Sequence, residues 1–154
     1  MNDRILIIHS AAEDLLRRIQ VDGIVKTRQE DDAIWVEVES GEAARLIGGK
    51  GETLDAFEHL LRSVLSKQFE EFVSVRVDIE GYRKRRNEYL RGLIRNVSRR
   101  VLESGKPEAL PHMSPSERRY VHMMVQEMEG VVSESMGERE ERQIVIKPLM
   151  KKIW

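Results

Sequence analysis

The sequence contains no cysteine, which excludes disulfide bonds, thiolate metal sites and cysteine nucleophiles. Aromatic residues make up only 5%, which argues against a large aromatic binding surface. The longest apolar run, Ile5 to Ile8, is far too short to span a bilayer or to form the core of a signal peptide. We therefore expect a cytoplasmic protein without stable membrane insertion.

Apolar residues nevertheless make up 40% of the 154 residues, enough for the core of one large domain or two small ones. Charge is divided unevenly along the chain. Residues 1–80 hold 10 Lys and Arg against 17 Asp and Glu, a net charge of −7, whereas residues 81–154 hold 16 against 10, a net charge of +6. This asymmetry points to a polyanion contact on the basic half, although two solvated halves that attract one another explain it equally well.

The sequence of the first half predicts helices alternating with short strands. Ser10-Ala11-Ala12-Glu13 has the pattern of a capping box and predicts a helix over 10–20. Alternating apolar residues, together with helical spacing further on, predict the remaining elements. They are strands near 23–28 and 33–39, a short helical turn over 43–47, a helix over 52–67 and a strand over 73–79.

The second half predicts two helices and a strand hairpin. A helix over 82–103 has an apolar stripe, and roughly opposite that stripe lie Lys84, Arg91, Arg95 and Arg99. The capping box Ser114-Pro115-Ser116-Glu117 predicts a helix over 115–128. Strands at 131–132 and 144–146 are expected to pair through a turn at Gly137. Because no flexible linker separates the halves, the domain boundary should be tight and near residue 80.

Gly48-Gly49-Lys50-Gly51, between two predicted helices, is the candidate binding loop of the first half. Its glycines allow a ligand to approach the backbone closely, and the amides that begin the next helix favour an anion. Lys50 adds a mobile positive charge for a phosphate. The alternative is a glycine turn that only joins two helices. In this order of elements, the segment Arg45 to Ala56 resembles a KH domain of the bacterial type, which implies a type II KH fold (α-β-β-α-α-β) for residues 1–80.

The KH resemblance implies that the loop clamps the backbone of about four single-stranded nucleotides. Ile47 would form part of an apolar floor for the bases. The sequence departs from the family pattern at Gly49, where a basic residue is common, and Glu52 follows directly and repels phosphate. The residues expected to contact RNA in this half are Arg45, Ile47, Gly48, Gly49, Lys50 and Gly51.

Arg118 and His122 lie four residues apart on the helix predicted over 115–128, so their side chains share a face. An arginine can fork onto phosphate oxygens, a neighbouring histidine can donate a hydrogen bond or stack on a base, and Arg119 adds charge. Alone, such a pair on an exposed helix is usually only solvated. However, residues 78–86 and 114–122, with 133–137 and 142–148, resemble the R-three-H domain, which takes its name from this Arg and His.

The R-three-H resemblance implies, for residues 81–148, a small α+β domain with an antiparallel sheet backed by two helices, which binds single-stranded nucleic acid. Lys84, Arg91 and Arg95 are then expected to contact the neighbouring backbone, and residues 149–154 form a short basic tail. A KH domain followed directly by an R-three-H domain is similar to the Jag family, bacterial proteins encoded beside a membrane-protein insertase. Because the chain begins at the KH domain, we expect it to lack the extra N-terminal domain of longer members.

Three classes of function follow from these patterns. The leading one is non-catalytic binding of single-stranded RNA, or of single-stranded DNA, without a cofactor. The alternative is a protein-interaction adaptor that acts through KH–KH association, as a homodimer or with a second KH protein, and binds RNA weakly or not at all. An enzyme such as a nuclease lacks support, because the chain has no carboxylate cluster with a catalytic signature, no cysteine and no GK[ST] phosphate loop. The neighbouring acids Glu134, Glu138, Glu140 and Glu141 lie in or near a turn, where charge is ordinary, and the four histidines lack the spacing of metal ligands.

Overall fold

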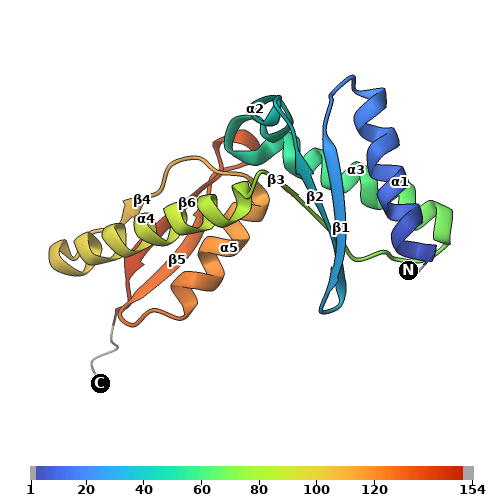
Figure 1. Ribbon diagram of the computed structural model, residues 1–154. Helices are drawn as coiled ribbons and strands as arrows, with labels where there is room; N and C mark the ends of the chain where they lie inside the picture. Colours follow the sequence, from blue (N-terminus) through green and yellow to red (C-terminus); the bar gives the residue numbers. More distant parts are fainter. Residues whose placement is uncertain (1–2, 151–154) are drawn as a thin grey trace. The chain divides into compact units, whose positions relative to one another are not determined.

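A computed structural model describes residues 3–150, which divide into two compact units between Arg83 and Lys84 (Figure 1). Both units mix helices and strands, and each has its own apolar core. The elements of the first unit are α1 (Asp3–Arg18), β1 (Ile24–Glu30), β2 (Ala33–Glu39), α2 (Ala43–Ile47), the 3-10 turn η1 (Gly49–Gly51), α3 (Glu52–Phe69) and β3 (Val75–Ile79). The remaining elements are α4 (Tyr82–Ser104), β4 (Glu108–Ala109), α5 (Pro115–Gln126), β5 (Val131–Met136), η2 (Arg139–Glu141) and β6 (Gln143–Pro148).

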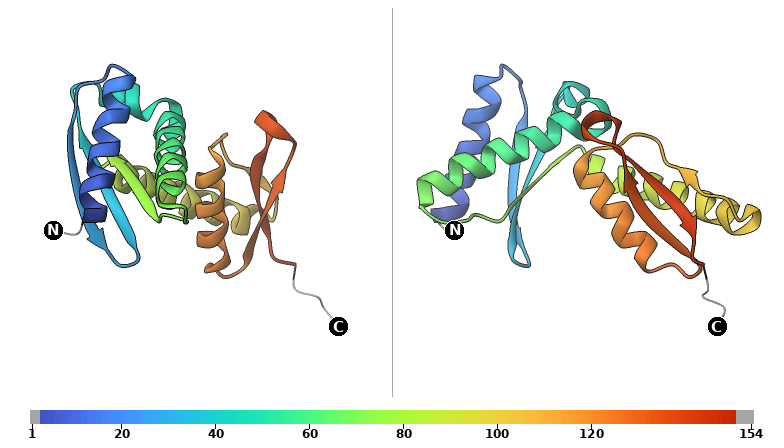
Figure 2. Two further views of the ribbon diagram at one scale, coloured as in Figure 1. Left: turned by 90° about the vertical axis from the view of Figure 1, so that its right-hand side faces the viewer. Right: turned by 180° about the vertical axis from the view of Figure 1, so that it is seen from behind.

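The first unit is built on a three-stranded mixed sheet. The central strand β2 runs antiparallel to β1 and parallel to β3. Ile34, Val36 and Val38 of β2 are buried, so the alternation read from the sequence does mark one face of a strand. Helices α1 and α3 cover that face (Figure 2) and supply the rest of the core.

Helix α1 begins at Asp3, so the prediction of a helix start at Ser10 was wrong. The apolar run at residues 5–8 belongs to this helix. Ile8, Ala12 and Leu16 recur every four residues and are all buried, whereas Leu6 is 48% exposed. The burial of this stripe extends the helix beyond the local capping pattern, because tertiary packing supplies most of the stability of a helix.

The second unit has a three-stranded antiparallel sheet in the order β4-β6-β5. Apolar side chains of α4 and α5, among them Ile94 and Val121, pack on Ile144 and Ile146 of the central strand β6. The prediction of a small antiparallel sheet with two helices is thus confirmed. Strands β5 and β6 are longer than predicted, and the two-residue strand β4 was not predicted from the sequence.

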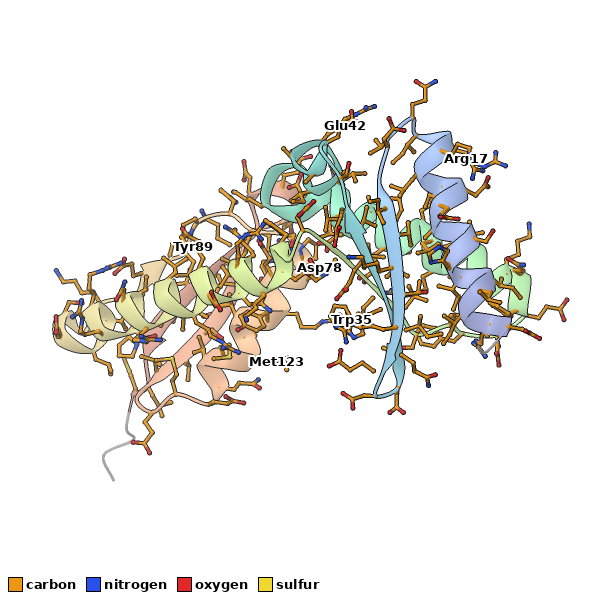
Figure 3. The ribbon with its side chains drawn as sticks, in the orientation of Figure 1. Arg17, Trp35, Glu42, Asp78, Tyr89 and Met123 are labelled. Carbon is orange, nitrogen blue, oxygen red and sulfur yellow. The ribbon has the colours of Figure 1, made fainter. Side chains whose placement is uncertain are left out.

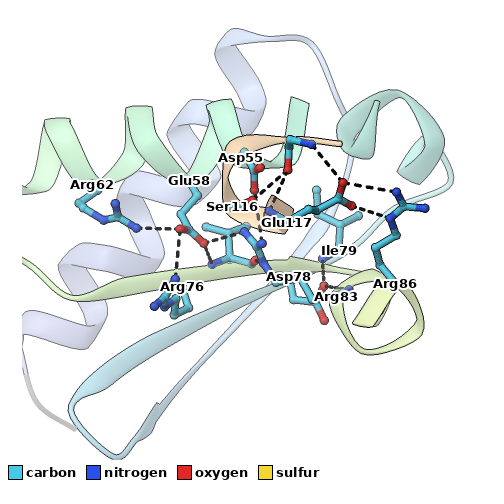
Figure 4. A network of polar contacts seen from close by, with 12 residues as sticks. Asp55, Glu58, Arg62, Arg76, Asp78, Ile79, Arg83, Arg86, Ser116 and Glu117 are labelled. Atoms are coloured by element: carbon cyan, nitrogen blue, oxygen red, sulfur yellow. Dashed lines mark hydrogen bonds and ion pairs between the residues drawn. The ribbon is translucent and has the colours of Figure 1, made fainter. Parts of the chain in front are cut away.

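Helix α5 begins at Pro115, as the capping box predicts. The hydroxyl of Ser114 accepts a hydrogen bond from the backbone N–H of Glu117, and the Glu117 carboxylate accepts one from the N–H of Ser114. The same carboxylate forms an ion pair with Arg86 of α4, at 2.5 Å (Figure 4). The start of α5 is therefore fixed both by its cap and by a contact to α4.

After β6, the described part of the chain ends at Met150. Of the predicted basic tail, residues 151–154 lie outside the described residues. Within residues 3–150, none of the helices combines the length and the apolar character needed to cross a membrane.

Candidate nucleic-acid interface

The glycine loop of the first unit joins α2 to α3, and two of its glycines adopt a backbone that other residues rarely reach. Gly48 has φ 71° and ψ −174°, and Gly51 has φ 80°. A Cβ atom at Gly48 would lie 2.8 Å from the Cβ of Thr53, and one at Gly51 would lie 2.9 Å from the ring of Tyr82. Both glycines are therefore needed for the turn itself.

Gly49 and Lys50 form the open part of this loop. A Cβ atom added at Gly49 would have no atom within 4 Å. Lys50 is exposed, and it holds a left-handed backbone at φ 55°, which costs a non-glycine residue about 1–2 kcal/mol. Lys50 makes no ion pair with any residue of the described range. The loop thus offers an accessible backbone and an uncompensated positive charge.

The loop leads into the N-terminus of α3, an 18-residue helix. Its N-cap residue, Gly51, has no side chain to accept hydrogen bonds from the first backbone N–H groups of the helix. The positive end of the helix dipole therefore faces the loop. Two acidic residues in the first turn oppose an incoming phosphate. The Asp55 carboxylate contacts Arg83 at 3.4 Å, which leaves Glu52 as the exposed acid of this turn.

The two predicted contacts that precede the loop have different surroundings. The Arg45 guanidinium lies 3.2 Å from the Glu42 carboxylate and 3.5 Å from the backbone carbonyl of Ile19, so its charge is already partly compensated. Ile47 is half-buried and packs against the first core. The structure thus brings Ile47 next to the loop as part of an apolar support, while Arg45 is held by an acidic neighbour.

A buried carboxylate fixes α3 to the sheet behind this loop (Figure 4). The side chain of Glu58 accepts hydrogen bonds from the backbone N–H of Val77 at 2.9 Å, from Arg83 at 2.8 Å and from Arg62 at 2.7 Å. Arg83 also donates to the Val77 carbonyl at 2.6 Å. These contacts hold the helix that follows the loop in a fixed position on β3.

In the second unit, the residues predicted to bind on α5 line a common hollow of about 430 Å³. Its walls carry three guanidinium groups and one imidazole, and no acidic residue of the described chain takes part in them. The hollow is therefore electropositive by composition, and an anion is the ligand it suits. The lining residues are Pro115, Arg118, Arg119, His122, Met123, Gln126, Ser135 and Arg142.

Two of these side chains are held by hydrogen bonds within the unit. Arg118 donates to the backbone carbonyl of Met113 at 2.8 Å, and Nδ1 of His122 lies 2.7 Å from the hydroxyl of Ser133 on β5. The contact to Ser133 fixes the ring and leaves Nε2 for a different partner. Arg119 is exposed and makes no ion pair within the described residues. The sequence-based grouping of Arg118, Arg119 and His122 on one face thus agrees with their common place in the hollow.

Arg142 also lines the hollow, although the sequence reasoning did not select it. Its Nε donates a hydrogen bond of 2.6 Å to the hydroxyl of Ser135 on β5. The β5–β6 register pairs Ser135 with Ile144 and Met136 with Gln143, which places Arg142 just before the paired part of β6. The signal available in the sequence was the alternation of Ser133 and Ser135, which puts both hydroxyls on one face of the strand.

The basic residues predicted on α4 do not line this hollow. Lys84, Arg91 and Arg95 are all exposed on that helix. Arg91 donates to the phenol oxygen of Tyr120 at 2.8 Å, which links α4 to α5, while Lys84 and Arg95 form no ion pair within residues 3–150. The same range contains no group of three or more histidine and acidic side chains placed to hold a metal ion.

Comparison with known proteins assigns the second unit. Residues 88–148 match the R-three-H domain family. The chain is 32% identical over 126 residues to the RNA-binding protein KhpB of Clostridium symbiosum, which covers 82% of this chain and 57% of the relative. It is 32% identical over 124 residues to RNA-binding protein KhpB of Bacillus subtilis, covering 79% and 60%. The chain belongs to the Jag family.

A third member of the Jag family, RNA-binding protein KhpB of Streptococcus pneumoniae, is 30% identical over 114 residues, which are 74% of this chain and 35% of that relative. The chain thus spans less than two thirds of the length of these Jag proteins. The R-three-H match and the Jag relatives confirm the family to which the sequence pattern pointed.

Proposed function

We propose that this chain is a non-catalytic, cytoplasmic protein that binds single-stranded RNA through both of its units. The observation that carries the proposal is the hollow beside α5, where Arg118, Arg119, Arg142 and His122 converge without an acidic wall residue among those described. A site of this composition suits the phosphate backbone, which supplies most of the affinity of nucleic-acid binding. The Jag relatives that carry the name RNA-binding protein support RNA as the ligand.

The first unit acts, in this proposal, as a KH module of type II. The order α1-β1-β2-α2-α3-β3, with the glycine loop between α2 and α3, supports this assignment. The open backbone at Gly49 and the charge of Lys50 receive phosphates, and Gly48 and Gly51 shape the loop. Ile47 supports the bases, and Arg45 contributes by exchanging Glu42 for a phosphate.

The second unit acts on the neighbouring part of the strand. Arg118 and Arg119 contact phosphates, and His122 presents Nε2 to a base or a phosphate oxygen. Lys84, Arg91 and Arg95 extend the positive surface along α4. Because both units belong to one chain, binding by one raises the effective concentration of the other, so two weak sites together give useful affinity. Single-stranded DNA should compete with RNA for this surface, since DNA and RNA offer the same phosphate groups to it.

Fluorescence anisotropy with a short labelled single-stranded RNA, at two salt concentrations, tests the proposal. The double variant Gly49→Asp/Lys50→Asp should lose the contribution of the first unit without unfolding, because the site at Gly49 is open. Its matched control is Gly41→Asp/Lys67→Asp, which makes the same charge change at a second open glycine and an exposed lysine. For the second unit, Arg118→Ala/His122→Ala should weaken binding and reduce the salt dependence.

Binding that is unaffected by both double variants would refute the site assignment. Absence of salt-sensitive binding by the wild type would refute RNA binding itself, because each phosphate contact on a single strand contributes about −0.7 to the slope of log K against log salt. The alternative function, an adaptor that associates with a second copy or with another KH protein, would then take its place. A groove of about 530 Å³ between α1 and α3, lined in part by Leu15, Leu61 and Val64, favours that alternative.

A further inference from the structure

The hollow of the second unit has two walls that come from different parts of the chain. Arg118, Arg119, His122, Met123 and Gln126 all belong to α5. The opposite wall consists of Ser135 on β5 and Arg142 just before β6. Helix and hairpin therefore each present at least one guanidinium to the same space, and a ligand between them is contacted from two sides.

Two serines of β5 hold the polar side chains of this hollow. Ser133 and Ser135 lie two residues apart and point to the same face of the strand. The Ser133 hydroxyl holds Nδ1 of His122 at 2.7 Å, and the Ser135 hydroxyl accepts from Nε of Arg142 at 2.6 Å. The Nε contact uses one of the five N–H donors of the guanidinium, so its terminal nitrogens stay available for a phosphate.

We propose that Arg142 is a further phosphate-binding residue of this site and that Ser135 is the residue that positions it. Arg142 and Arg118 then contact the backbone of one strand from opposite walls of the hollow. This inference rests on the proposed function and deepens it. It names the β5–β6 hairpin as part of the binding surface, in addition to the Arg and His of α5.

The composition of the hollow also indicates what is held beside the phosphate. Met123 is 59% exposed on α5, and Figure 3 shows it projecting from the helix. It and Gln126 lie one and two turns along α5 from Arg119. The thioether offers an apolar surface to a base, and the amide offers a donor and an acceptor to a base edge. The ligand class is therefore one nucleotide unit of a single strand rather than an isolated anion.

The test uses the full chain and the labelled RNA described above. Arg142→Gln removes the charge but keeps an N–H donor for Ser135, and Arg142→Ala removes both. Arg139→Ala is the matched control, because Arg139 is an exposed arginine of the same hairpin that does not line the hollow. Ser135→Ala removes the positioning hydroxyl, and Ser135→Thr retains it.

Both Arg142 variants should weaken RNA binding about 10-fold, the effect of losing one charge-assisted hydrogen bond. They should also lower the salt slope by about 0.7, a change that a purely structural role would not produce. Ser135→Ala should weaken binding with the salt slope nearly unchanged, and Ser135→Thr should restore it. Arg139→Ala should affect neither quantity. An abasic strand should bind more weakly than the intact strand, and Met123→Ala should reduce that difference.

The outcomes separate this inference from the function on which it rests. If Arg118→Ala/His122→Ala weakens binding while both Arg142 variants behave like Arg139→Ala, the hairpin takes no part and only this inference is overturned. If the wild type shows no salt-sensitive RNA binding, the proposed function fails and this inference fails with it. Equal losses for intact and abasic strands in every variant would overturn the assignment of a nucleotide in favour of a bare phosphate.

Discussion

Replacing Glu58 with glutamine removes the carboxylate that holds α3 against β3. Its side chain is 10% exposed, and its partners Arg62 and Arg83 are 29% and 24% exposed. The variant keeps the shape of the side chain but leaves two arginines without their common charge, and one amide hydrogen now faces a guanidinium donor. We therefore expect the first unit to become markedly less stable.

The magnitude follows from the burial of the cluster. Removing one partner of a buried ion pair costs about 3–5 kcal/mol, because the remaining charge stays buried. Both arginines retain some contact with water, and Arg83 keeps its contact with Asp55 at 3.4 Å. Both effects lower the cost, so we expect a loss of about 2–4 kcal/mol in the free energy of unfolding. The hydrogen bond from the Val77 N–H to the remaining side-chain oxygen should survive.

Urea unfolding followed by the fluorescence of Trp35 measures this loss in the first unit. Trp154 is replaced by phenylalanine in every variant so that a single tryptophan reports. The control is Glu71→Gln, which breaks an ion pair with Arg4 in the same unit. Glu71 and Arg4 are 54% and 35% exposed, so solvent screening limits their pair to at most about 1 kcal/mol. If Glu58→Gln costs no more than Glu71→Gln, the cluster does not stabilise α3 as argued.

Three further variants probe the loop, the cap of α5 and an ion pair near β4. Lys50→Gly relieves a left-handed backbone at φ 55°, so the melting temperature of the protein should rise, while RNA affinity should fall because the positive charge is lost. A fall in both quantities would show that Lys50 does not hold a left-handed backbone. Ser114→Ala removes the N-cap of α5 and should cost about 1 kcal/mol in urea unfolding, with no loss for Ser10→Ala, at an exposed serine within α1, as control. A hydrogen bond from Arg100 lowers the pKa of Glu108, so the pair stabilises the fold at neutral pH and this contribution disappears as acid protonates Glu108. In Arg100→Gln the pKa of Glu108, followed by NMR, should be higher than in the wild type; an unchanged value would contradict the pairing.

Local patterns predicted the parts of the fold in which nearby residues decide the outcome. The start of α5 was predicted correctly because Ser114 and Glu117 satisfy each other across one helical turn. The start of α1 was not, because the burial of Ile8 against the sheet is a tertiary effect that a capping pattern does not contain. Strand β4 was missed since two residues, Glu108 and Ala109, carry too little pattern to predict a strand.

The sequence likewise predicted only those parts of the candidate site that depend on local spacing. Arg118 and His122 share a helix, so their spacing alone placed them on one face. Arg142 reaches the same hollow only through the register of the β5–β6 hairpin, which the sequence did not determine. For Arg45, the i, i+3 spacing from Glu42 was a signal in the sequence for their ion pair, but the carbonyl of Ile19, 26 residues away, reaches the guanidinium only through the fold.

The difference between the glycines of the loop has a consequence for how such proteins diverge. Gly48 and Gly51 are fixed by their backbone angles and by Thr53 and Tyr82, so most substitutions there damage the fold. Gly49 has empty space where a side chain would begin. Selection can therefore change the charge at this one position, for example to lysine or arginine, without first restoring stability elsewhere. Ligand affinity and folding can evolve independently at a loop where they would otherwise be coupled.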